Sequence, residues 1–185
     1  MSWIQTSSGM RFYPQNPEKS TFKIQDIAHA LSQLCRFGGH TMHFYSVAQH
    51  SVLVAEIVES LGGSKSDQLW GLMHDATEAY MIDLPTPIKA LFPEYKVMEK
   101  ALMKVLQKRF GLADCGDLEM PAIVKEADAI ALRTEAGQLI FGGCADWKIT
   151  QTHQPYNTDI FALSPMLAQR SFMSRWDDLS SLGEN

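Results

Sequence analysis

Apolar residues recur at intervals of three and four along most of this chain of 185 residues, and glycine or proline interrupts each run. Such spacing places the apolar side chains on one face of an α-helix, and that face must be buried against other helices. No comparable succession of alternating apolar and polar residues indicates a set of strands. The pattern therefore predicts an all-α fold, which we expect to be a single-domain helical bundle.

The predicted helices begin near capping residues and end near glycine or proline. Prolines such as Pro121 and Pro165 fit the first turn of a helix, because an amide at that position would have no partner within the helix. The helices are expected to cover, approximately, residues 25–34, 46–61, 67–81, 94–110, 119–140 and 164–179.

The length of the chain suits a single hydrophobic core. We expect one domain over residues 1–185 with its core at about residues 20–140. Residues 1–24 contain Gly9 and Pro14 and are predicted to form an extended arm or a hairpin. Residues 142–185 are predicted to form a loop, over 142–163, followed by the C-terminal helix.

Composition limits the partners and the cellular location. The chain has 16 basic and 21 acidic residues, so it lacks the overall positive charge that would favour a nucleic-acid polymer. Its apolar stretches are too short to span a bilayer, and its first residues lack the basic and apolar blocks of a signal peptide. We therefore expect a cytoplasmic protein without a membrane partner. Cys35, Cys115 and Cys144 are far apart in the sequence and are predicted to be free thiols.

The doublet His74-Asp75 lies in the middle of the helix predicted over residues 67–81. Gly71, His74, Asp75 and Glu78 follow the spacing i, i+3, i+4, i+7, so their side chains share one helical face beside the apolar stripe. Burial of an unsatisfied polar group costs roughly 2–7 kcal/mol. A bound metal ion would remove this cost, and the doublet therefore indicates a metal site.

Further ligands would have to come from other helices, and His50 and Asp128 are the candidates because each lies within an apolar helical pattern. Two imidazoles and two carboxylates suit Zn, Mn, Co, Ni or Fe and leave positions open for water and substrate. Taken singly, His50 could instead be a satisfied core histidine, and Asp128 could pair with a lysine or arginine. The combination of all four residues favours the metal.

The segment HDATEAYMIDLPTPIK at residues 74–89 resembles the signature HD…E…GDLPTPVK of bacterial 5′-deoxynucleotidases and phage dATP triphosphohydrolases. Both groups belong to the HD-domain superfamily of metal phosphohydrolases. SVAQHS around His50, KEADAI around Asp128 and Cys-Arg-Phe at residues 35–37 also have counterparts there. The resemblance covers about residues 20–135 and implies a single HD domain.

The resemblance implies that His50, His74, Asp75 and Asp128 bind a divalent ion, either Zn, Co, Mn or Mg. Such an ion would lower the pKa of a bound water and supply hydroxide to attack phosphorus. Glu78 could orient or deprotonate that water or assist the leaving group, although it could also be a solvent-facing helical residue.

The loop that follows the doublet supplies further candidates by resemblance. The residue matching Asp83 contacts sugar or catalytic water in the related enzymes, whereas its alternative role here is to cap the next helix. Lys89 matches a residue that contacts phosphate. Pro85 and Pro87 stiffen the loop and would hold these side chains over the site.

Arg36 and Phe37 are the remaining candidates for substrate contacts. The guanidinium of Arg36 could bind phosphate oxygens through two parallel hydrogen bonds. Phe37 could stack on a base or exclude a 2′-hydroxyl, and the related enzymes commonly have tryptophan at this position. The choice of sugar and base therefore stays open.

The resemblance implies a hydrolase of deoxynucleotide 5′-phosphates with a small-molecule nucleotide substrate, and it implies a homo-oligomer. We expect a dATP or dNTP triphosphohydrolase, because the SVAQHS and Cys-Arg-Phe-Gly-Gly segments are more similar to the phage enzymes. A 5′-deoxynucleotidase acting on dNMPs and a non-catalytic nucleotide-binding HD module are the alternatives. HD branches that act on cyclic dinucleotides or guanosine alarmones are disfavoured, because a GYP motif and an adjacent Glu-Asp pair are both missing.

Overall fold

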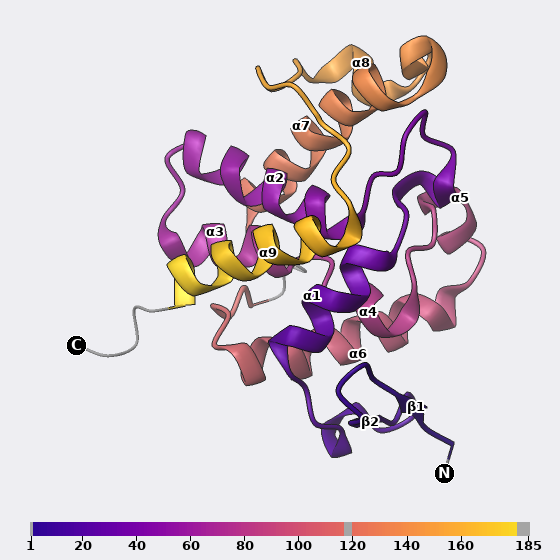
Figure 1. The fold of residues 1–185 in the computed structure, drawn as a ribbon, viewed down its shortest axis with the longest axis vertical. Helices are drawn as coiled ribbons and strands as arrows, with labels where there is room; N and C mark the ends of the chain where they lie inside the picture. The colour runs from indigo at the N-terminus through magenta and orange to yellow at the C-terminus, as the bar shows by residue number, and fades with distance from the viewer. Residues whose placement is uncertain (1, 117–119, 181–185) are drawn as a thin grey trace.

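Helix α2 is the central element of the fold, and it contacts α1, α3, α7 and α9. The computed structural model describes residues 2–116 and 120–180. In Figure 1, α9 lies across the core with α1, α2 and α3 beside it. The helices are α1 (Ile24–Gln33), α2 (Val47–Ser60), α3 (Lys65–Met73), α4 (Glu78–Met81), α5 (Thr86–Lys89), α6 (Pro93–Phe110), α7 (Ala122–Leu139), α8 (Lys148–Thr152) and α9 (Pro165–Ser180), with 3₁₀ turns η1 (Pro17–Lys19), η2 (Arg36–Gly39) and η3 (Phe141–Cys144). The all-α prediction is confirmed.

Helix α2 is central because its sequence is apolar on more than one face. Val47, Val54 and Ile57 are among its buried residues, and the polar His50 is buried with them. Ser46 caps the helix, because its side chain accepts a hydrogen bond from the amide of Gln49 at 3.2 Å. The core formed around α2 thus fixes the direction in which His50 points.

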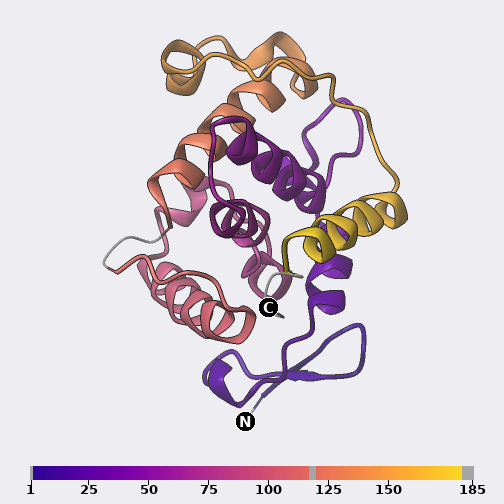
Figure 2. The same ribbon diagram turned by 90° about the vertical axis from the view of Figure 1, so that its left-hand side faces the viewer.

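The N-terminal arm forms a hairpin, one of the two arrangements predicted for residues 1–24. Strands β1 (Ile4–Gln5) and β2 (Arg11–Phe12) pair in antiparallel register, with Ile4 opposite Phe12. The buried carboxylate of Asp26 on α1 accepts hydrogen bonds from the hydroxyls of Thr6, Ser7 and Ser8 and thereby anchors the hairpin turn. Figures 1 and 2 show this hairpin and α8 at opposite ends of the molecule.

The prediction of one continuous helix over residues 67–81 is wrong, because the helix is interrupted in its middle. Helix α3 ends at Met73, residues 74–77 form turns, and α4 begins at Glu78. The carbonyl of Gly71 accepts the Nδ1–H of His74 at 2.7 Å instead of continuing the helical ladder. The amides of Ala76 and Glu78 then bond carbonyls three residues back, at 3.0 and 2.9 Å. The His-Asp doublet therefore lies in a tight turn between two helices, which corrects the placement on one continuous helical face.

Two other boundaries differ from the prediction. The predicted start of a helix at Glu119 lies outside the described residues, and Pro121 immediately precedes α7 instead of occupying its first turn. The segment predicted as a loop over residues 142–163 contains most of η3 and all of α8. Short segments of this kind have too few residues to show a helical period, and their tertiary contacts decide whether they form.

The cysteines Cys35, Cys115 and Cys144 are free thiols, as predicted. Within residues 2–116 and 120–180, none of the helices has both the length and the apolar character that crossing a membrane requires. The prolines of the loop after Asp83 also have a structural consequence, since Pro87 lies in the first turn of the short helix α5.

Gly71 allows α2 and α3 to approach closely. A Cβ atom at this position would lie 3.2 Å from the Cα of Ala55 and 3.2 Å from Cγ2 of Val58 on α2. Backbone cannot yield as a flexible side chain can, so any larger residue would push the two helices apart. Because His50 and His74 come from these two helices, the contact also sets their separation.

We expect Gly71→Ala to lower the free energy of unfolding by about 1–3 kcal/mol, because it overpacks the α2–α3 contact. Gly137→Ala is the matched control, because Gly137 is an exposed residue of α7 whose added Cβ would meet only the mobile end of Arg133. This control should raise the free energy of unfolding by about 0.5–1 kcal/mol. Urea denaturation of both variants provides the measurement, and equal changes would contradict the close-contact role of Gly71.

Candidate metal centre

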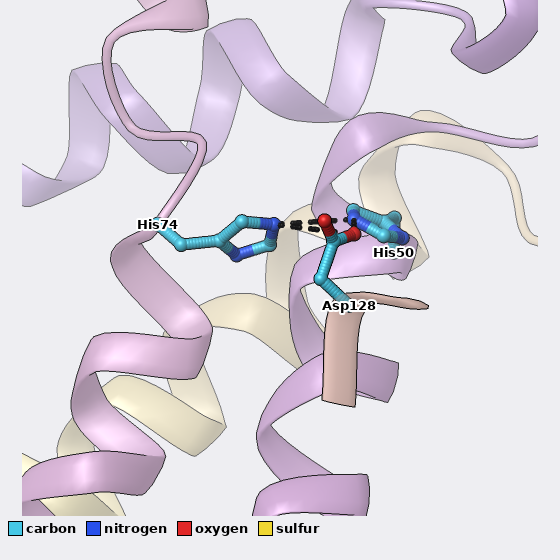
Figure 3. A group of neighbouring side chains, drawn as sticks. All are labelled: His50, His74 and Asp128. Atoms are coloured by element: carbon cyan, nitrogen blue, oxygen red, sulfur yellow. Dashed lines mark hydrogen bonds and ion pairs between the residues drawn. The ribbon is translucent and has the colours of Figure 1, made fainter. Parts of the chain in front are cut away.

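Three side chains from three helical segments converge on one point. His50 comes from α2, His74 follows the last residue of α3, and Asp128 lies on α7. The Nε2 atoms of the two histidines are 3.2 Å apart, and Oδ1 of Asp128 lies 3.2 Å from Nε2 of His50 and 3.9 Å from Nε2 of His74. Figure 3 shows the carboxylate of Asp128 between the two imidazoles. These side chains form a group that could hold a metal ion.

Asp75 joins the same group. Its Oδ2 atom lies 3.3 Å from Nε2 of His74 and 3.6 Å from Nε2 of His50. The structure thus brings together all four residues that the sequence analysis proposed as ligands. The side chains of Asp75 and Asp128 are 20% and 39% exposed, whereas that of His50 is 0% exposed, so solvent and substrate can reach the group from its carboxylate side.

The hydrogen bonds of the histidines determine which ring nitrogen faces the centre. The carbonyl of Gly71 can only accept, so Nδ1 of His74 must carry the proton in their 2.7 Å bond. Nδ1 of His50 lies 2.6 Å from Oε1 of Glu135 and donates to that carboxylate in the same way. In their neutral forms, both imidazoles therefore direct Nε2 lone pairs at each other across 3.2 Å. Two lone pairs at this distance repel unless a metal ion or a proton lies between them.

The donor set fits a divalent metal ion. Ligand atoms that share an ion at about 2.0–2.2 Å lie roughly 2.8–3.6 Å apart. The separations between the two histidines, and from each histidine to each carboxylate, run from 3.2 to 3.9 Å, close to this range. Two nitrogen and two carboxylate oxygen donors suit a transition metal of the Zn, Mn or Co kind and leave coordination positions for water or substrate.

Glu135 is a site residue that the sequence analysis did not identify. It lies on α7, is fully buried, and binds three partners at once: Nδ1 of His50 at 2.6 Å, Nη2 of Arg36 at 2.8 Å and the hydroxyl of Tyr45 at 3.0 Å. Its position seven residues after Asp128, two turns along the same helix face, was a signal that could have revealed it. Outer carboxylates of this kind fix the orientation of a metal-binding histidine.

The charges around the group favour a cation at its centre. Burial and the charge of Arg36 lower the pKa of His50, but Glu135 and hydrogen bonds with Asp128 and Glu135 outweigh them and raise it to about 9. Burial raises the pKa of Asp75, yet His74, His50 and Arg36 together hold it well below its usual range. The carboxylates thus stay ionised and attract positive charge, which a metal ion would supply.

Glu78 is buried beside the ligands, which excludes the solvent-facing alternative. Burial and the negative charges of Asp75 and Asp83 raise its pKa well above the usual value. Its Oε2 atom is buried and has no hydrogen-bond partner among the described residues, while Oε1 lies 4.0 Å from Nζ of Lys89. A buried carboxyl oxygen without a partner is costly, so a partner such as substrate or bound water is expected.

Asp83 and Lys89 flank Glu78. Burial raises the pKa of Asp83 above its usual value, and the positive charge of Arg36 offsets only part of this increase. Lys89, at the end of α5, donates a hydrogen bond to Oε1 of Glu99 at 2.8 Å. Pro87 lies in the same short helix and contributes rigidity; its role in substrate binding stays a prediction.

Arg36 and Phe37 lie in the 3₁₀ turn η2, next to the ligands. Nη1 of Arg36 is 3.8 Å from Oδ2 of Asp75, while Nη2 is held by Glu135. Its Nε atom is buried and has no partner in the described part of the chain. The ring centroid of Phe37 lies 5.3 Å from the guanidinium carbon of Arg36. Both residues are therefore beside the metal centre, as a role in substrate binding requires.

We expect Glu135→Gln to weaken binding of Mn²⁺ or Co²⁺ by about 10- to 100-fold. The glutamine amide has no negative charge to balance Arg36, and its single oxygen cannot replace both carboxylate oxygens that bind His50 and Arg36. Glu126→Gln is the control, since Glu126 lies on α7 with 55% of its side chain exposed. Calorimetric titration with the metal gives the affinity, and thermal melting shows whether the variant is folded. Wild-type metal affinity in a folded Glu135→Gln protein would contradict the positioning role.

Comparison with known proteins gives two relatives that cover most of the chain. The chain is 40% identical over 185 residues to the uncharacterized protein YfdR of Escherichia coli (strain K12), and the match covers 98% of each chain. It is 34% identical over 143 residues to the uncharacterized protein RCAP_rcc00048 of Rhodobacter capsulatus, covering 75% of this chain and 73% of that protein. No protein-family model matches the chain.

A third relative has a named activity. A 5′-deoxynucleotidase of Vibrio cholerae is 32% identical over 111 residues, which cover 46% of this chain and 57% of that enzyme. This partial match supports a relationship to HD-type phosphohydrolases and thus to a nucleotide hydrolase. The longer matches identify the group directly: the chain belongs to the family of YfdR from Escherichia coli and RCAP_rcc00048 from Rhodobacter capsulatus.

Proposed function

We propose that this protein is a metal-dependent hydrolase of deoxynucleotide 5′-phosphates. The observation that carries the proposal is the convergence of the Nε2 atoms of His50 and His74 with carboxylate oxygens of Asp75 and Asp128. Beside them lies the buried Glu78, whose Oε2 atom has no hydrogen-bond partner among the described residues. The partial similarity to a 5′-deoxynucleotidase supports the nucleotide as substrate class.

The four ligand residues would hold the ion, which when bound lowers the pKa of water and polarises the phosphate. Glu78 acts as a proton donor or acceptor at Oε2. Its raised pKa makes the protonated form more accessible than in an ordinary glutamate, and this form can donate a proton to the departing 5′-oxygen. Asp83 lies close enough to Glu78 to contribute to that shift and can orient the sugar or the attacking water.

Arg36 and Lys89 contact the phosphate in this proposal. Nε of Arg36 is a buried donor without a partner among the described residues, and a phosphate oxygen can accept from it. Glu135 holds the opposite edge of the same guanidinium, which keeps the group oriented before substrate arrives. Lys89 can turn from Glu99 toward a phosphate, since its ammonium is already 4.0 Å from Glu78.

The monophosphate reaction is better supported than the triphosphate reaction that the sequence analysis preferred. The relative with a named activity is a 5′-deoxynucleotidase. Two cations lie close enough to Glu78 and Asp83 to lower their pKa values, namely Arg36 and Lys89. Both are already paired with carboxylates: Arg36 with Glu135, and Lys89 with Glu99. A triphosphate carries more negative charge than a monophosphate and would need more cationic partners.

The decisive experiment incubates metal-loaded protein with dAMP, dATP, dGTP and ATP and separates phosphate from triphosphate. We expect orthophosphate from dAMP and a strict requirement for Mn²⁺, Co²⁺ or Zn²⁺. Triphosphate from dATP would support the triphosphohydrolase instead. Absence of any product with every metal would contradict hydrolysis and favour a non-catalytic nucleotide-binding protein.

Substitutions should separate the ligand role from the proton-transfer role. Asp75→Ala should remove metal binding and turnover together while helical content is retained, because Asp75 supplies a ligand oxygen. Glu78→Gln should keep the metal and lower kcat by about 10²–10⁴-fold, because an amide cannot transfer the proton. Metal content and initial rates measured on the same samples test both expectations. Equal loss of metal in both variants would make Glu78 a ligand.

The resemblance to HD phosphohydrolases is also the basis for proposing a homo-oligomer. The segment that follows the site contains candidates for such an interface, since Ile82, Leu91, Phe92 and Val97 are each more than half exposed. Exposed apolar side chains that gather in one segment commonly mark interaction surfaces. Light scattering of the purified protein measures the oligomeric state directly.

A further inference from the structure

An aromatic pair lies on the outer side of Arg36. The rings of Phe37, in η2, and Trp147, just before α8, have centroids 6.2 Å apart and planes inclined at 40°. The amide of Met42 donates to the carbonyl of Leu139 at 2.8 Å and joins the two segments that carry the pair. The last 45 residues of the chain, which contain no recognisable motif, thus place a large aromatic side chain beside a site residue.

The pair continues a line of residues that starts at the metal centre. Nη1 of Arg36 is 3.8 Å from Oδ2 of Asp75, and the guanidinium carbon of Arg36 is 5.3 Å from the ring centroid of Phe37. The ring of Trp147 in turn lies 6.2 Å from that of Phe37. A nucleotide has the same order of parts, because its base is separated from its phosphate by the sugar.

The backbone on both sides of the pair is strained. Phe37 has φ of 54° and Cys144, three residues before Trp147, has φ of 50°, a region that residues with a side chain rarely adopt. The amide of Trp147 donates to the carbonyl of Cys144 at 2.9 Å, so the strained turn fixes the start of α8. Strain of this kind persists only where surrounding structure imposes it, and it gathers at ligand sites.

Trp147 is also accessible. It is 41% exposed, although an indole of this size is usually buried in a core. Phe37 lies beside the indole at a centroid distance of 6.2 Å, and the exposed part of the indole can be reached from solvent. A rigid aromatic surface that is partly exposed and held in place suits stacking with a nucleobase.

We propose that Phe37 and Trp147 form the nucleobase subsite of this protein, with the base stacked on Trp147 and the phosphate directed past Arg36 to the metal centre. This inference rests on the proposed function. Every nucleobase has an aromatic face, so the subsite accepts purines and pyrimidines, and purines bind more tightly because they cover more of the indole. Trp147 is a specificity-determining residue that touches the base and not the reacting phosphate.

The test compares Trp147→Ala with Trp3→Ala in metal-loaded protein. Trp3 is the matched control: it is also 41% exposed, and it precedes the hairpin at the end of the molecule opposite α8. Deoxyadenosine and inorganic phosphate, the two products of dAMP hydrolysis, are titrated separately by calorimetry. We expect Trp147→Ala to weaken deoxyadenosine binding by about 5- to 100-fold and to leave phosphate binding unchanged.

Trp147→Phe separates stacking from a merely structural role, because it should restore most of the affinity for deoxyadenosine. Equal affinities in Trp147→Ala, Trp3→Ala and wild type would overturn the subsite, as would a wild-type protein that binds no deoxyadenosine. Binding that depends on Trp147 without hydrolysis of any nucleotide would support the subsite and refute the proposed reaction. If Trp147→Ala hydrolyses nucleotides with an unchanged KM, the proposed reaction would be supported and the subsite refuted.

Discussion

The carboxylate of Glu135 binds His50, Arg36 and Tyr45 simultaneously in a fully buried position, and the arrangement of the whole site depends on it. A buried carboxylate is unfavourable alone, but here each oxygen has a donor and the charge has a cationic partner. The same group fixes the tautomer of His50 and the orientation of Arg36. A single buried carboxylate thus aligns one candidate metal ligand, His50, and one candidate phosphate-binding side chain, Arg36.

The bundle complements this interaction by bringing the two histidines together. The close contact of α2 and α3 at Gly71 sets the distance between the elements that carry His50 and His74. The carbonyl of Gly71 also directs the imidazole of His74. Metal binding requires ligand atoms placed within fractions of an ångström. Packed helices carry His50 and Asp128, and the contact at Gly71 positions the turn that carries His74 and Asp75.

Much of the fold could be predicted from the sequence because its long helices carry clear periodicity and boundaries. Three boundaries lie where they were predicted: α2 begins directly after Ser46, α6 ends at Gly111, and Pro165 opens α9. The break at Met73 could not be predicted. Local propensity favours a continuous helix through residues 74–77. The helix ends at Met73 instead, where the side chain of His74 donates a hydrogen bond to the carbonyl of Gly71.

The sequence by itself determined the helical class and the candidate ligands His50, His74, Asp75 and Asp128. Polar residues that interrupt an apolar helical pattern can be recognised from the order of residues alone. It also supplied the doublet and the Asp-Leu-Pro-Thr-Pro segment that carry the likeness to HD phosphohydrolases. Only the tertiary structure decided that Glu135 orients His50, that the buried Oε2 atom of Glu78 lacks a hydrogen-bond partner among the described residues, and that Trp147 adjoins Phe37. These relations join residues far apart in the chain, and their distances follow from helix packing, which no local pattern encodes.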